Sequence, residues 1–98
     1  MSDEVNRIAI EGEMTIYRAA DLKVTVLEAL RQARVLEIDL SGITELDTAG
    51  LQVLMLAKQT ATADQRELRL LRHSPAVMEI FEMLDLVAFF GDAVLIHD

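Results

Sequence analysis

The chain has 98 residues, which suffices for one compact domain over residues 1–98 and leaves no room for a second domain with a linker. Apolar residues make up 52% and charged residues 27%, which excludes a disordered chain, and the absence of cysteine excludes disulfides and thiolate metal sites. The formal charge of -8 repels phosphate backbones and anionic lipid heads, so nucleic acid is not an expected partner.

The sequence predicts neither a secretion signal nor a membrane span. Residues 1–4 are acidic and lack the basic-then-apolar plan of a signal peptide. The longest uninterrupted apolar stretches, residues 53–57 and 86–90, are far too short to cross a membrane. We therefore expect a cytoplasmic protein without direct membrane insertion.

Strands and helices alternate along the chain. Alternation of apolar and polar residues predicts strands at residues 7–11, 35–40 and 67–70, and a short edge strand at residues 94–96. Strands covered by helices on both faces would be almost continuously apolar, so helices are expected mainly on one face. The prediction is an α/β domain with a mixed four-stranded sheet. Charges on its open face are expected to pair across strands: Arg7, Glu37, Asp39 and Arg69.

Two of the three predicted helices flank the central part of the chain. The first covers residues 19–33, and its apolar stripe consists of Leu22, Val26, Ala29, Leu30 and Ala33. The last begins with Ser74 as N-cap and Pro75 in the first helical position. Its expected buried residues are Val77, Ile80, Phe81 and Leu84.

The middle helix follows residues 41–46, which are expected to leave the central strand, and Asp47 or Thr48 is its expected N-cap. At about 100° per residue, its inner arc consists of Gly50, Leu54, Ala57 and Ala61. The opposite arc consists of Thr48, Gln52, Met55 and Gln59, with Leu56 at its margin. Apolar positions cover more than the stripe of about 100° that a one-sided sheet needs, so Met55 and Leu56 are expected to stay exposed as part of a protein-binding surface.

Thr48 carries the candidate chemistry of this surface. A hydroxyl at a helix start lies where free N–H groups and the helix dipole favour an anion. A phosphate on Thr48 would add roughly -1.5 to -2 charges in the middle of the expected contact face. From the residues alone, the alternative is that Thr48 is simply a helix cap.

Three separated motifs resemble the STAS domain, the fold of bacterial anti-sigma factor antagonists and of the cytoplasmic domain of sulfate transporters. They are Asp39-Leu40-Ser41-Gly42, Asp47-Thr48-Ala49-Gly50-Leu51, and Ser74-Pro75-Ala76-Val77 with Phe81 and Leu86. The resemblance covers nearly the whole chain, from about Arg7 onward.

The resemblance implies a non-enzymatic signalling module. In the antagonists, the residue after the Asp of Asp-(Ser/Thr)-x-Gly is phosphorylated by a partner serine/threonine kinase of the anti-sigma type. Thr48 occupies that position and is the implied phospho-acceptor. The implied partner-binding residues are Asp47, Thr48, Ala49, Gln52, Met55, Leu56 and Gln59.

Two departures from the antagonist pattern point to a compact branch of the family. Antagonists usually have a strand before the one at residues 7–11, and Ala49 stands where many have a second serine. The Asp-Thr-Ala-Gly-Leu form resembles the small STAS subunit of phospholipid-transport ABC complexes, whose corresponding threonine and helix contact the ATPase. The implied partner is an anti-sigma factor, a serine/threonine kinase or a chemosensory signalling protein, with an ABC-transporter ATPase as the alternative. A monomer or weak homodimer is expected.

Other candidate sites are weaker. Asp39 and Asp47 offer two carboxylates for Mg²⁺ at the end of the central strand, but a surface charge and a helix cap are the preferred interpretation. His73 and His97 lack ligand spacing and are expected to be solvated. Phosphate-binding glycine loops and nucleophile elbows are missing, so we expect no enzyme activity, no metal and no cofactor.

Overall fold

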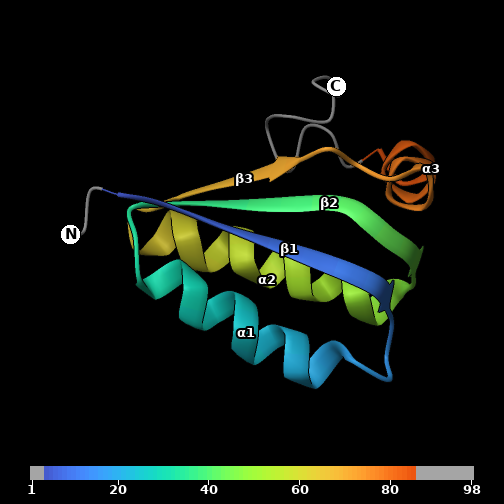
Figure 1. Ribbon diagram of the computed structural model, residues 1–98, viewed down its shortest axis with the longest axis horizontal. Helices are drawn as coiled ribbons and strands as arrows, with labels where there is room; N and C mark the ends of the chain where they lie inside the picture. The colour runs from blue at the N-terminus through green and yellow to red at the C-terminus, as the bar shows by residue number, and fades with distance from the viewer. Residues whose placement is uncertain (1–3, 86–98) are drawn as a thin grey trace.

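A computed structural model of the protein describes residues 4–85, shown in colour in Figure 1. Its elements are β1 (Val5–Met14), α1 (Ala19–Arg31), β2 (Val35–Leu46), α2 (Thr48–Ala63), β3 (Glu67–Leu71) and α3 (Pro75–Met83). The predicted edge strand at residues 94–96, as well as Leu86 and His97, lies outside the described residues.

The sheet confirms the α/β class but differs from the prediction in detail. Within residues 4–85 it has three strands in the order β1-β2-β3, and both neighbouring pairs are parallel. Parallel neighbours need a crossover, which α1 and α2 provide. In Figure 1, α1 and α2 lie together against one face of the sheet, whereas α3 lies at its far end. The fourth strand and the mixed pairing are not found in the described part of the chain.

Both long strands extend beyond their predicted limits. Residues 41–46 were expected to leave the central strand, but they remain in β2 because they pair with the second half of β1. Glu11 pairs with Gly42, and Met14 pairs with Leu46. The register shifts between Ala9 and Glu11 and again between Gly12 and Glu13. Gly12 has a φ of 83°, a left-handed conformation that glycine adopts without strain. These irregularities break the period of two and so conceal the pairing.

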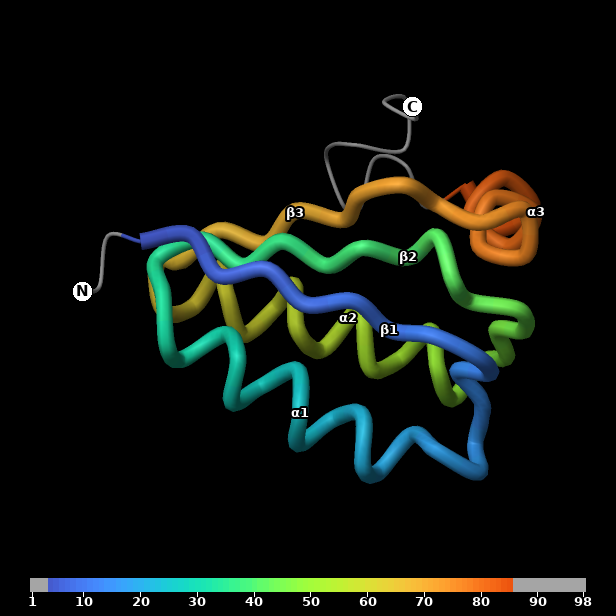
Figure 2. Tube along the Cα trace, viewed as in Figure 1, coloured from blue at the N-terminus to red at the C-terminus, as the bar shows by residue number. Residues whose placement is uncertain are grey.

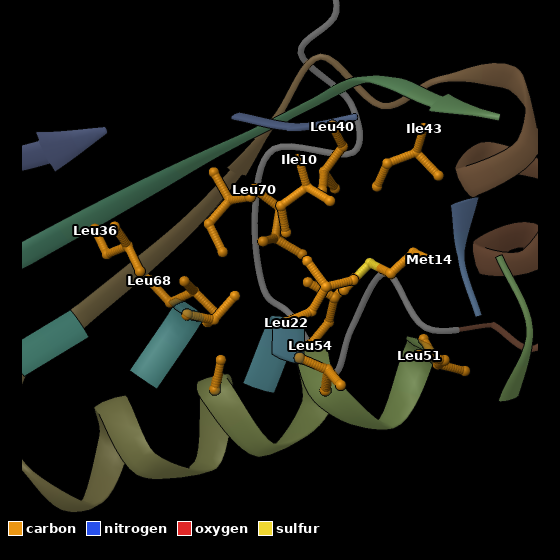
Figure 3. Close-up of a cluster of buried hydrophobic side chains, with 14 of the residues drawn as sticks. Ile10, Met14, Leu22, Leu36, Leu40, Ile43, Leu51, Leu54, Leu68 and Leu70 are labelled. Atoms are coloured by element: carbon orange, nitrogen blue, oxygen red, sulfur yellow. The ribbon is translucent and has the colours of Figure 1, made fainter. Parts of the chain in front are cut away.

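The core lies between the sheet and the layer formed by α1 and α2, as Figure 3 shows for Leu54, Leu68 and Leu70. All five residues of the stripe predicted for residues 19–33 are buried, although α1 ends at Arg31 and Ala33 follows it. The predicted inner arc of α2 is also confirmed, and its four residues are buried. The prediction for α2 was incomplete, because Leu51 and Val53 are buried in addition to this arc.

The start of α3 agrees with the prediction, but its end does not. Ser74 is the N-cap, and its Oγ accepts a hydrogen bond of 3.2 Å from the N–H of Val77. Val77 and Phe81 are buried. Leu84 is 52% exposed, so its predicted burial is wrong: α3 ends at Met83, and Leu84 occupies the C-cap position.

His73 is buried, although the sequence predicted a solvated side chain. Its ring meets the ring of Phe81 edge-on, with 5.4 Å between the ring centroids. The ring is thus part of the packing between the end of β3 and α3. The spacing of His73 in the sequence bears only on metal binding and gives no indication of this packing role.

The open face of the sheet carries the predicted cross-strand ion pairs. Glu37 on β2 accepts a hydrogen bond of 2.7 Å from Arg7 on β1 and one of 3.3 Å from Arg69 on β3. Arg69 also pairs with Glu67 at 2.8 Å. Asp39 takes no part in these pairs and instead accepts a hydrogen bond from the N–H of Ser41, which lowers the pKa of its carboxyl group.

Candidate functional site

Asp47 joins the start of α2 to the loop between β1 and α1. It is the N-cap of α2, where its Oδ1 accepts a hydrogen bond of 2.9 Å from the N–H of Gly50. Its Oδ2 accepts one of 3.0 Å from the N–H of Ile16. These bonds hold the pKa of the Asp47 carboxyl below its usual value because they stabilise the charged form, and the bond from Gly50 has the larger effect. One carboxylate therefore fixes two segments.

Gly50 allows α2 to approach the end of β1. A Cβ atom at this position would lie 1.9 Å from the carbonyl oxygen of Met14, far inside any real contact distance. The same oxygen accepts a hydrogen bond of 3.3 Å from the N–H of Asp47. The Asp-x-x-Gly spacing thus combines a helix cap with the close packing that the junction needs.

Thr48 is the first residue of α2, and its side chain is exposed. Since Asp47 supplies the cap, the alternative that Thr48 is the helix cap is wrong. The Thr48 hydroxyl lies at the positive end of the helix dipole and next to an ionised carboxylate. The cap does not involve this hydroxyl.

The other predicted contact residues differ in exposure. Gln52 and Gln59 are exposed, whereas Ala49, Met55 and Leu56 are half-buried. Met55 packs partly against the core. The expected exposure of Met55 and Leu56 is thus only partial, and neither side chain forms a fully solvated ridge.

A groove of about 380 Å³ lies between the first halves of α1 and α2. It brings together three of the predicted contact residues, namely Ala49, Gln52 and Leu56. Met55 and Gln59 are not among its lining residues. The remaining lining residues are Ala19, Ala20, Lys23 and Val53. Three of the seven predicted contact residues therefore share a groove with the first half of α1.

Ile16 and Tyr17 were missed by the sequence analysis. They are 68% and 88% exposed, and they lie in the loop between β1 and α1. Figure 2 shows this loop at the same end of the molecule as the start of α2. The sequence did contain a signal for an exposed apolar loop. Ile16 and Tyr17, the only tyrosine, are two large apolar residues between the strand pattern and the stripe of α1.

Asp39 and Asp47 do not come together. Asp39 lies inside β2 and Asp47 directly follows its end, so the extended chain separates them by roughly 25 Å. Residues 4–85 contain no group of three or more His, Asp or Glu side chains that could hold a metal ion. In the same residues, no helix combines the length and apolar character that crossing a membrane requires.

These features define an α/β domain that presents an exposed hydroxyl at a tightly capped helix start. The family model described as "Mlab, STAS domain" matches residues 1–95, and the chain belongs to this STAS domain family. Members of the family are generally non-enzymatic interaction modules.

Solved structures support the same fold. The crystal structure of an anti-sigma factor antagonist from Mycobacterium paratuberculosis is 20% identical with a TM-score of 0.82, and the match covers 96% of this chain and 80% of that one. The unphosphorylated form of the anti-sigma factor antagonist SpoIIAA is 19% identical with a TM-score of 0.70, covering 85% and 74%. No curated protein matches the chain. The fold is that of an anti-sigma factor antagonist-like STAS domain.

Proposed function

We propose that the protein is a cytoplasmic signalling module that binds a cognate serine/threonine kinase or anti-sigma factor through the start of α2, and that phosphorylation of Thr48 switches this binding. The observation that carries the proposal is that Asp47 caps α2, while the neighbouring Thr48 is exposed and takes no part in the cap. The Thr48 hydroxyl is therefore the group that we propose a kinase phosphorylates.

A phosphate at this position would act on the partner more than on the fold. It would stand among the proposed contact residues, next in sequence to Asp47. Neither the capping bond from Gly50 nor the loop bond from Ile16 depends on Thr48. A partner that docks there would have to bury a doubly charged group. The expected loss is about 2 kcal/mol of binding free energy, which raises Kd roughly 30-fold.

The test combines intact mass with partner binding. The protein is incubated with ATP and the serine/threonine kinases encoded next to it, and we expect one added phosphate group. Thr48→Val should abolish the addition, whereas Thr62→Val, which changes an exposed threonine at the far end of α2, should not. Thr48→Glu should weaken binding of the same kinase. Phosphate added to Thr48→Val, or none added by any of these kinases, would contradict the switch.

The second candidate function is that of a regulatory subunit contacting an ABC-transporter ATPase with the same surface. Ala49 in the compact motif and the "Mlab" description of the matching family model favour it. In this case Thr48 makes a constitutive contact. Intact mass stays unchanged with every kinase, while Thr48→Glu still weakens binding to a co-expressed ATPase.

A further inference from the structure

Ile16 and Tyr17 are held in place although they face solvent. The Ile16 N–H is bonded to Asp47, and the N–H of Arg18 donates a hydrogen bond of 2.9 Å to the carbonyl oxygen of Thr15. The Arg18 guanidinium donates to two carbonyl oxygens of β1, that of Glu11 at 2.7 Å and that of Glu13 at 2.5 Å. A loop fixed at both ends that exposes an isoleucine and a tyrosine is typical of a binding surface.

This loop is continuous with the two-helix groove. It leads directly into α1, whose Ala19 and Ala20 line the groove. On the other side, Asp47 connects the loop to Thr48 and Ala49. The groove walls come from two helices, and the lining contains no strand residue. A helix laid between them is the segment that such a groove receives best.

The charges around this surface are mainly negative. The strand register places Glu13 directly opposite Glu45, a pair that repels. Asp21 and Asp47 lie in or next to the first turns of α1 and α2, where they offset the positive ends of the helix dipoles. Residues 13–23 and 45–52 contain four carboxylates, namely Glu13, Asp21, Glu45 and Asp47, and two cations, Arg18 and Lys23. Lys23 is the only charged residue that lines the groove itself, so the excess of negative charge lies at its flanks.

We infer that Ile16, Tyr17 and the groove form one docking surface for a partner helix that is apolar on its contact side and carries lysine or arginine on its flanks. The inference rests on the proposed function, since it describes the partner of the same site. A second copy of this chain is a poor occupant, because each copy has a formal charge of -8.

Two synthetic amphipathic helical peptides test the inference. They share an apolar face of leucines and differ only in having lysine or glutamate on the polar face. By fluorescence anisotropy, we expect the lysine peptide to bind at least about tenfold more tightly, and this preference should shrink at high salt. Tyr17→Ser should weaken the lysine peptide about tenfold. Val5→Ser, which changes a 55% exposed residue at the other end of β1, should leave its Kd unchanged.

The outcomes separate this inference from the proposed function. The inference is overturned if neither peptide binds, if both bind equally, or if Tyr17→Ser and Val5→Ser behave alike. In that case loss of kinase binding by Thr48→Glu would still support the proposed function. The converse result would support the docking surface and refute the switch. In that result, binding of the lysine peptide depends on Tyr17, but the kinase does not phosphorylate Thr48 and its binding is unchanged by Thr48→Glu.

Discussion

Replacement of Gly50 by alanine tests the junction between β1 and α2. The added Cβ would lie 1.9 Å from the carbonyl oxygen of Met14 and 2.7 Å from its carbonyl carbon. Both are main-chain atoms of a buried strand end, so no side-chain rotation relieves the contact and the first turn of α2 must move. The move also strains the Asp47 cap and its bond to Ile16.

The size of the effect follows from two opposing contributions. Overpacking against a fixed backbone costs about 3 kcal/mol, the upper part of the usual range. Alanine regains about 1 kcal/mol of helix propensity relative to glycine. The net loss is about 2 kcal/mol, which lowers Tm by roughly 8 to 16 °C for a domain of this size.

Gly42→Ala is the matched control. The nearest atom to its added Cβ is Cγ of Glu11 at 2.8 Å, which rotation of this exposed side chain can move away. Cβ of Glu11 at 3.3 Å needs a shift of only a few tenths of an ångström, and the nearest main-chain atom, Cα of Glu11, is at an ordinary 3.5 Å. Thermal and urea unfolding of both variants are compared, and Gly42→Ala should change Tm by no more than a few degrees. Equal stability of the two variants would refute the packing argument for Gly50.

Three other changes probe the same structure. The pKa of Asp47 is lower in the folded state than in the unfolded state. Its carboxylate therefore stabilises the fold at any pH above the unfolded-state pKa, and this contribution is lost as the pH falls through the folded-state pKa. The stability difference between the wild type and Asp47→Asn should therefore shrink in urea titrations below about pH 4. Glu37→Gln removes the charge shared by Arg7 and Arg69, and it should lower Tm by a few degrees, less at high salt. Arg18→Gln should speed hydrogen exchange of the Ile16 N–H while leaving that of Leu70 unchanged, because only the loop loses its two carbonyl contacts.

The helix faces were predictable because burial follows the helical period. Leu22, Val26 and Leu30 of α1, and Leu54 and Ala57 of α2, are all buried where the spacing placed them. The α/β class and the cap at Asp47 or Thr48 also follow from local rules. Local sequence is informative wherever the determining contacts are within one element.

The length of β2 and the exposure of α2 were not predictable by the same means. The second half of β2 pairs across irregularities on either side of Gly12, and such a register depends on two strands at once. The half-burial of Leu56 depends on α1, which forms the other wall of its groove. A single helix wheel includes no neighbouring helix, so it overestimated the free surface of α2.

The docking role that we propose for Ile16 and Tyr17 depends on how firmly their loop is held. A flexible loop would lose part of its binding energy when a partner orders it, whereas a loop fixed beforehand does not. Here the Asp47 carboxylate and the Arg18 guanidinium supply that order in the free protein. One oxygen of the Asp47 carboxylate accepts the hydrogen bond from the loop at Ile16, and the other accepts the hydrogen bond from Gly50 in the first turn of α2. Under the proposed function, a phosphate on Thr48 would stand next in sequence to the residue that holds both parts of the surface, and it would act on a partner bound there.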